Sequence, residues 1–240
     1  MATTLEIQRR LAELGFQPGP LDGVPGPKTA EAIKQFQRAR GLAADGIVGP
    51  ITSAALFGTT PPQDAAPSGI VPADWMPAAK MQRIIVHWTA GAHKASGLDR
   101  SHYHIMIEDD GKLVRGTPSI DLNQAPTRKG YAAHTLNCNS GSVGVSLCCM
   151  ASAVENPFAV GSAPMTRKQW GTLPKVLAAL CKRYGIVVTP KTVLSHAEVQ
   201  GTLGIAQRGK WDISRLAFDP TVLGATACGD LFRAATKALL

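Results

Sequence analysis

The sequence predicts an α/β fold in two parts: an N-terminal three-helix domain and a C-terminal domain with a mixed sheet and flanking helices. Three observations support this prediction: a short internal repeat with helical spacing, a proline-rich stretch after it, and β-branched runs that alternate with helical patterns in the remainder. The 240 residues suit two domains of ordinary size. The expected boundaries are 1–58 for the helical domain, 59–79 for the linker and 80–240 for the α/β domain.

The internal repeat lies in the first part, where the run LDGVPGPKT at residues 21–29 recurs as ADGIVGPIT at residues 44–52. Asp-Gly pairs favour turns, and the Gly-Pro pair after each turn suits a helix start because proline is tolerated in the first helical turn. Ile33 and Phe36 are spaced to face one core. The expected helices are a first that ends at Gly15, a second over 29–40 and a third over 52–56.

The larger part alternates strand-like and helix-like segments. Short apolar, β-branched runs predict strands, and longer runs with apolar residues at helical spacing predict helices. Thr166 and Gln169 have the spacing of a capping box, and Pro174 predicts a kink or a later start in the helix that follows. The expected strands are 83–87, 103–108, 112–116, 142–149 and 192–195, and the expected helices are 166–184 and 228–239.

The charge is unevenly distributed along the chain, whose formal net charge is +8. Residues 1–58 carry six Lys or Arg against five Asp or Glu, whereas residues 80–240 carry nineteen against ten. A basic second domain suits an anionic polymer. The sequence has no basic run and no nucleic-acid motif, which argues against a nucleic-acid partner.

Neither a membrane span nor a secretory signal is expected from the hydropathy pattern. No apolar run approaches the roughly 20 residues that a helix needs to cross a bilayer, so no stable membrane insertion is expected. The first residues lack the basic and apolar regions of a secretory signal. Synthesis in the cytoplasm is therefore expected.

A histidine, a lysine and an aspartate lie close together late in the chain. His196 follows a short apolar run, and Lys210 and Asp212 follow a glycine-containing loop, where an extended backbone would place both on one face. Three histidine or carboxylate ligands with an open fourth position are typical of hydrolytic zinc sites. His87, at the end of a β-branched run, is the candidate third ligand. Taken singly, each residue also fits a buried histidine or a solvated lysine.

These residues, in this order, resemble the zinc-dependent N-acetylmuramoyl-L-alanine amidases, a family that includes phage lysozyme-amidases, bacterial wall-recycling amidases and peptidoglycan recognition proteins. The resemblance covers roughly residues 82–220. It implies Zn²⁺ on His87, His196 and Asp212, and it implies that Lys210 stabilises the charged tetrahedral intermediate. Asp212 stands where the phage enzymes and recognition proteins have cysteine, and a carboxylate also suits zinc. Glu198 is expected either to orient a ligand or to lie on the surface.

A third segment carries the resemblance and supplies a second catalytic candidate. The run SHYHIMI at residues 101–107 is similar to the family strand whose tyrosine points at the attacking water, which implies this role for Tyr103. The recycling amidases have a catalytic glutamate where Ser146 stands here, and this departure favours the tyrosine arrangement. The alternatives are a tyrosine packed in an edge strand and a serine in the core.

The same resemblance implies substrate contacts near His87. The runs YAAHT at residues 131–135 and NSGSVGVSL at residues 139–147 match the family's Ala-His segment and the strand after it. The match implies that His134 lines the cleft and contacts substrate. Trp88 and Thr89, which follow the first candidate ligand, are expected to contact substrate as well.

The first part resembles the small three-helix peptidoglycan-binding domain. The resemblance is carried by the repeated Asp-Gly-x-x-Gly-x-x-Thr pattern, by Phe36-Gln37 and by the Gly-Leu pair after the second helix. It implies a wall-targeting role with a shallow groove near the repeat turns. Asp22 and Asp45 are the candidate wall contacts, and turn formation is the alternative for both.

Together these observations predict a modular peptidoglycan hydrolase that cleaves the amide between N-acetylmuramic acid and L-alanine with zinc-activated water. The expected partner is bacterial peptidoglycan, and the expected state is a monomer. A phage or prophage endolysin, released by a holin-type lysis partner to act on the wall in the periplasm, fits the missing signal. The alternatives are a metal-free recognition module and a secreted antibacterial effector that cuts another stem-peptide amide.

Overall fold

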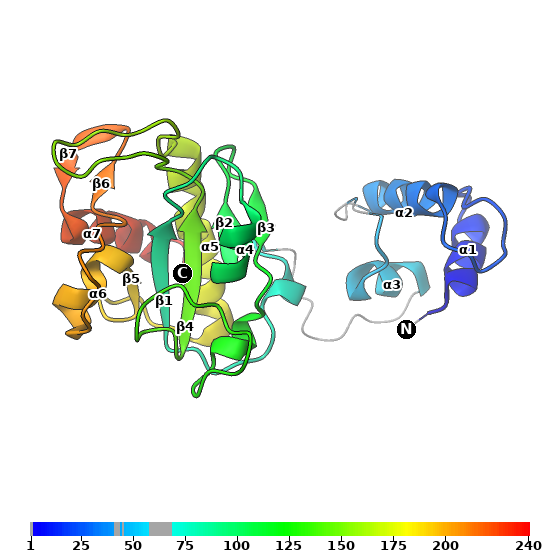
Figure 1. Ribbon diagram of the computed structural model, residues 1–240. Coiled ribbons are helices and arrows are strands. Elements are labelled where there is room, and N and C mark those ends of the chain that lie inside the picture. The colour runs from blue at the N-terminus through cyan, green and yellow to red at the C-terminus, as the bar shows by residue number, and fades with distance from the viewer. Residues whose placement is uncertain (1, 41–43, 45, 58–68) are drawn as a thin grey trace. The chain divides into compact units, whose positions relative to one another are not determined.

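The computed structural model of the chain describes residues 2–40, 44, 46–57 and 69–240 (Figure 1). The chain divides into two compact units, Met1–Ser68 and Gly69–Leu240. In the described residues, no helix has both the length and the apolar content needed to cross a membrane. The five cysteines are free and buried.

The first unit contains three helices, α1 (Thr4–Glu13), α2 (Pro27–Ala39) and α3 (Pro50–Phe57), which confirms the predicted three-helix fold. Helix α2 begins two residues earlier than expected because proline is accommodated at its first position. The predicted core residues Ile33 and Phe36 are buried. They share one apolar cluster with residues of all three helices, namely Leu11, Ala32 and Leu56.

Each repeat turn closes around a buried glutamine of the preceding helix. Gln8 accepts a hydrogen bond from the backbone N–H of Gly23 and donates to Val24 O and to the Asp22 carboxylate. In the second repeat, Gln37 accepts from the backbone N–H of Gly46. The Asp22 carboxylate also accepts from Val24 N–H, so it is part of its own turn. The other candidate wall contact, Asp45, lies outside the described residues.

The second unit is built on a five-stranded sheet in the order β3-β2-β4-β1-β5. The strands β2, β4, β1 and β5 are parallel, and β3 is antiparallel to β2, so the predicted mixed sheet is confirmed. The strands are β1 (Arg83–Trp88), β2 (Ile105–Ile107), β3 (Leu113–Arg115), β4 (Ser142–Leu147) and β5 (Val193–Ser195). The shorter elements are the 3-10 turns Ala73–Trp75 and Ile120–Asn123 and a hairpin of β6 (Arg215–Leu216) and β7 (Asp219–Leu223).

The long helices α5 (Arg167–Tyr184) and α7 (Ala225–Lys237) pack against each other and cover one face of this sheet (Figure 1). Side chains alternate along a strand. Ile84, Val86 and Trp88 of β1 therefore enter the main core, whereas Ile85 and His87 point to the opposite face. The candidate site is built on this opposite face.

The predicted start of α5 is confirmed, but other element boundaries differ from expectation, and α7 begins three residues earlier than expected. Thr166 caps α5 in a capping box with Gln169, and the helix continues through Pro174, so a later start does not occur. A short helix α4 (Gly97–His102) was not predicted, although Ser96 caps it. The strand expected from residue 103 therefore begins only at residue 105, and Tyr103 is the C-cap of α4.

Part of the segment expected as linker packs on the second unit. Val71 and Met76 are buried in its main core. Arg183 donates a hydrogen bond to Met76 O, and the Tyr184 hydroxyl donates to Pro77 O. The described part of the segment is thus hydrogen-bonded to the last residues of helix α5.

Candidate metal centre

The three predicted ligands converge on one point. His87, His196 and Asp212 are all buried, and one ligand atom from each lies within 4.8 Å of the others. The Nδ1 atoms of His87 and His196 lie 3.1 and 3.2 Å from Asp212 Oδ2. In the part of the chain that the structure describes, this is the group of His, Cys, Asp and Glu side chains that can hold a metal ion.

The sheet brings the two histidines together. His87 lies near the carboxyl end of β1, and His196 is the first residue of helix α6 (His196–Leu203), directly after β5. Strands β1 and β5 are parallel neighbours with Val86 opposite Ser195, so both histidines reach the same sheet edge. The carboxyl ends of parallel strands are where open α/β sheets commonly bind ligands.

Asp212 comes from the loop after α6, which is tied to the start of that helix. The Ala197 N–H donates to Asp212 O at 2.6 Å. Helix α6 begins with a capping box of Ser195 and Glu198. The Glu198 carboxylate pairs with the buried Arg233 of α7 at 2.8 and 3.0 Å. Glu198 is buried, so the expected surface position is wrong, and it fixes the helix that presents a ligand.

The protonation state of the cluster suits a divalent cation. Burial lowers the pKa of His87 to about 4, although the Asp212 carboxylate beside it acts in the opposite direction. Asp212 is ionised at neutral pH, because its pKa lies below the ordinary aspartate value. A neutral imidazole and an ionised carboxylate are the forms that bind zinc. Two imidazole nitrogens and one carboxylate oxygen also match the donor set of catalytic zinc sites, which leave a fourth position open.

Of the two predicted catalytic residues, Tyr103 lies beside a ligand. The Tyr103 ring is 5.1 Å from the His87 ring between centroids, and burial, reinforced by the Asp212 charge, raises the pKa of its phenol. Ser146 is buried opposite His87 across the β1–β4 pair, next to Tyr103. Lys210 is exposed and lies in a loop outside the strands. Its charge still contributes to lowering the pKa of His87.

An open cavity of about 450 Å³ is lined by residues that neighbour two of the ligands in sequence. It is bounded on one side by Lys210, Trp211 and Ala197, the residues adjacent in sequence to two of the ligands. Its other lining residues are Glu155 from the loop after β4, Ser214 and Arg215, and three residues from the end of β7 to the start of α7. The cavity thus presents two cationic side chains and one carboxylate.

The predicted substrate contacts occupy different positions from those expected. His134 is 7% exposed and lies behind His87, with its Nδ1 3.2 Å from His87 Nε2. Gly144 makes room for it, because a Cβ atom there would lie 2.6 Å from the His134 ring. Trp88 points to the opposite face of β1 and packs on Trp211 in the core. Strand alternation separates it from His87, so its expected contact with substrate is wrong, whereas Thr89 is half-buried.

Sequence reasoning missed two supporting residues. Gln207 is 3% exposed, and its Oε1 lies 2.9 Å from His196 Nε2. His104, also buried, accepts from the Gly144 N–H through Nδ1 and donates to Asn123 through Nε2. A glutamine in a loop carries no sequence pattern. Strand periodicity places His104 on one face but does not identify its partners.

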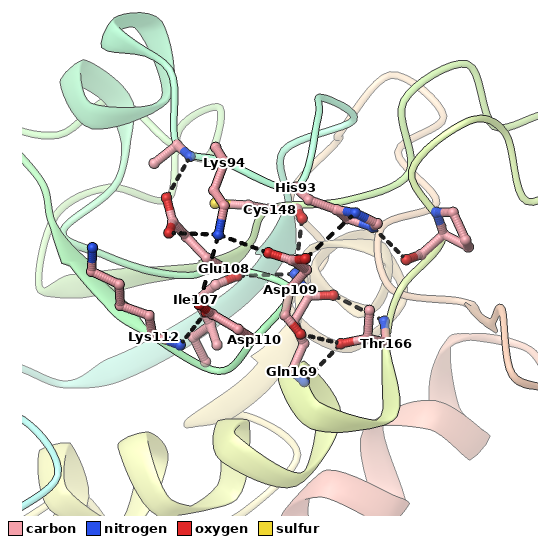
Figure 2. A network of polar contacts seen from close by, with 12 residues as sticks. His93, Lys94, Ile107, Glu108, Asp109, Asp110, Lys112, Cys148, Thr166 and Gln169 are labelled. Carbon is pink, nitrogen blue, oxygen red and sulfur yellow. Dashed lines mark hydrogen bonds and ion pairs between the residues drawn. The ribbon is translucent and has the colours of Figure 1, made fainter.

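A polar network holds the segment that leads to Tyr103 (Figure 2). Lys94 Nζ binds the carboxylates of Glu108 and Asp109 at 3.2 and 2.9 Å, across the β2–β3 turn. Thr166 donates to Asp109 O, and the Gln169 amide donates to carbonyl groups at the ends of β2 and β4. The loop before α4, the hairpin turn and the start of α5 are thereby joined.

Acid is expected to destabilise the metal-free second unit through His104. Burial lowers the pKa of His104 to about 4 from 6.5. As pH falls, the unfolded chain takes up the proton first, so this contribution is complete above pH 6.5 and is lost between pH 6.5 and 4. The shift corresponds to about 3 kcal/mol in the free energy of unfolding. Urea unfolding followed by tryptophan fluorescence at several pH values measures it, because all four tryptophans lie in this unit.

The variant His104→Gln should show a weaker pH dependence than the parent chain over that range. The matched control is His102→Gln. This variant replaces a histidine of α4 whose Nδ1 contacts Leu98 O and the Ser101 hydroxyl. Equal slopes for the parent and His104→Gln would contradict this assignment.

Comparisons with known proteins agree with the two-unit organisation. The sequence profile described as N-acetylmuramoyl-L-alanine amidase matches residues 77–213, and the profile described as putative peptidoglycan binding domain matches residues 2–56. The chain is similar to the N-acetylmuramoyl-L-alanine amidase CwlM of Mycobacterium tuberculosis, with 49% identity over 51 residues, which are 21% of this chain and 13% of the relative. It is equally similar to the amidase CwlL of Bacillus licheniformis, with 49% identity over 57 residues, which are 21% of this chain and 16% of that relative.

The chain thus spans less than a fifth of the length of these curated relatives. Among solved structures, an E90A mutant of PlyL aligns with a TM-score of 0.42 and 18% identity, over 67% of this chain and 87% of that one. The amidase profile covers more than half of the chain, including His87, His196 and Asp212. The chain therefore belongs to the N-acetylmuramoyl-L-alanine amidase family.

Proposed function

We propose that the chain is a zinc-dependent peptidoglycan amidase that hydrolyses the bond between N-acetylmuramic acid and L-alanine. The observation that carries the proposal is the three-ligand centre of His87, His196 and Asp212, which lies within the segment matched by the amidase profile. In this proposal, residues 1–58 bind the wall and residues 80–240 carry the catalytic domain. The protein acts as a phage or prophage endolysin, a monomer that reaches the wall after a holin-type partner releases it.

The chemistry follows from the groups around the centre. A zinc ion held by the three ligands would supply a Lewis acid and lower the pKa of water to about 7. The Tyr103 phenol stays protonated at neutral pH, because burial raises its pKa, and it donates a hydrogen bond to the attacking water or to the substrate carbonyl. Lys210, at the edge of the cavity, donates to the developing oxyanion, an interaction that often dominates catalysis of acyl transfer.

The three ligands also bear on the alternatives. A recognition module that binds the wall without a metal has no need of three buried, converging ligand atoms, so their retention favours hydrolysis. The choice between the muramyl amide and another stem-peptide amide depends on where the peptide lies in the open cavity.

Mass spectrometry of wall fragments tests the proposal. Purified peptidoglycan is digested with the zinc-loaded full chain, with chelator-treated protein as the control. Stem peptides that begin at L-alanine, and glycan strands without peptide, are expected only with zinc. Zinc-dependent cleavage at another amide would keep the metal centre and overturn the bond assignment. An unaltered wall with protein bound to it would support the recognition module.

The variant Tyr103→Phe is expected to lower kcat roughly 100-fold while zinc content stays stoichiometric, because it removes one hydrogen-bond donor at the reacting atoms and no ligand. The matched control is Tyr131→Phe, since Tyr131 is exposed. Turbidity loss of wall suspensions measures the rate. An unchanged rate for Tyr103→Phe would assign this tyrosine to packing alone.

A further inference from the structure

We propose that Gln207 and His134 are positioning residues that hold the two histidine ligands as Nε2–H tautomers, so that both Nδ1 lone pairs face Asp212. The inference rests on the proposed function for the identity of the cation. The hydrogen bonds that carry it lie behind the ligands and involve no metal.

The orientation of the Gln207 amide is fixed by its surroundings. Its Nε2 donates to Leu136 O at 2.8 Å and to Ile205 O at 3.2 Å. The reverse orientation would place the amide oxygen against two carbonyl oxygens, so Oε1 must be the atom that faces His196 Nε2 at 2.9 Å. Because Oε1 only accepts, His196 Nε2 must carry the proton. In a neutral ring, Nδ1 is then a lone pair directed at Asp212.

The same reasoning applies to His87 through His134. His134 Nε2 faces Ser142 O at 3.4 Å, and a carbonyl only accepts, so this nitrogen carries the proton and His134 Nδ1 is an acceptor in the neutral ring. His134 Nδ1 accepts from the Thr135 hydroxyl at 2.8 Å, and His87 Nε2 lies 3.2 Å from that nitrogen and 3.4 Å from Thr135 Oγ1, which can accept from it. His87 therefore donates through Nε2. Its Nδ1, like that of His196, is left as a lone pair.

The consequence is a cluster of acceptors without a proton of its own. Nδ1 of His87, Nδ1 of His196 and Oδ2 of Asp212 converge within 4.8 Å, and each presents lone pairs to the others. A cation at the centre of these three atoms would relieve the repulsion between their lone pairs. Partners that orient ligating histidines in this way typically change metal affinity by roughly 10- to 100-fold. Gln207 and His134 thus prepare the centre for the cation.

The first test is the tautomer itself, read from the ¹⁵N shifts of the imidazole rings in the metal-free full chain at pH 7.5. The expected spectrum has His196 and His87 as Nε2–H tautomers in the parent chain, and His196 as a tautomer mixture in Gln207→Met. A parent spectrum in which His196 carries its proton on Nδ1 would overturn the inference. This measurement uses neither zinc nor peptidoglycan, so a failure of the proposed function leaves its outcome unchanged.

The second test is zinc affinity, measured by competition with a chromophoric chelator. Gln207→Met, which keeps the side-chain length but removes the acceptor, should bind zinc roughly 10- to 100-fold more weakly than the parent. The matched control is Gln200→Met, because Gln200 holds the same loop through the Gln207 N–H without facing a ligand. Equal weakening in both variants would show that loop order, and not the acceptor, sets the affinity.

Discussion

Replacement of Asp212 by alanine is expected to abolish stoichiometric zinc binding and to lower kcat/KM more than roughly 1,000-fold. Asp212 is the only charged member of the ligand group, and its Oδ2 lies within 3.2 Å of both histidine nitrogens. Its loss leaves two neutral ligands and removes the Lewis-acid contribution together with the lowered pKa of water. Metal analysis of the dialysed full chain and turbidity loss of wall suspensions measure the two effects.

Two further variants make this result interpretable. Asp219→Ala removes a carboxylate that binds Thr221 in the β6–β7 hairpin and contacts no ligand, so zinc content and rate should match the parent. Asp212→Cys replaces the carboxylate with a thiolate, which is also a suitable zinc ligand, and should recover zinc binding. Zinc retained at parental affinity by Asp212→Ala would contradict the assigned centre.

The sequence predicted the three candidate metal ligands better than it predicted the buried residues that hold them in place. His87 and His196 follow β-branched or apolar runs, and a run of that kind ends at a sheet edge, so their convergence follows from the strand pattern and a parallel sheet. Asp212 is a candidate because it lies close to His196 in sequence and a carboxylate suits zinc, and the family resemblance implies the same role. By contrast, Gln207 and His104 act through tertiary contacts that leave no local periodicity.

Two features of the fold differ from the sequence-based expectation for physical reasons that local sequence patterns do not reveal. Ser96 caps a six-residue helix, too short for apolar periodicity to reveal, and this helix places Tyr103 at its C-cap rather than in a strand. Trp88 follows a ligand in sequence but alternates to the other face of β1, where it enters the core. His87 and Trp88 are therefore adjacent in sequence but lie on opposite faces of β1. Pairing of the strands, by contrast, brings His87 close to residues far along the chain.

The second large effect concerns the stability of the unit that carries the centre: Arg233→Met is expected to lower its free energy of unfolding by about 3–5 kcal/mol. The side chains of Arg233 and Glu198 are 4% and 3% exposed. Arg233 also donates to Val193 O in β5, so it joins α7 to the strand and the helix on either side of His196. Without Arg233, the Glu198 carboxylate remains buried and unpaired. The Glu198 carboxylate has little room to move to another position, because even a Cβ atom on Gly229 would lie 2.4 Å from it.

Urea unfolding of the full chain, followed by tryptophan fluorescence, separates this effect from a loss of charge at the surface. Arg115→Met is the matched control, because Arg115 pairs with Asp74 at 3.4 Å in solvent and an exposed pair contributes less than about 1 kcal/mol. The double variant Glu198→Gln with Arg233→Met should recover part of the loss, since it removes the unpaired charge. If Arg233→Met were no more destabilising than Arg115→Met, the buried pair would not stabilise the helix that presents His196. The geometry of the centre would then depend on its own loop and on the sheet.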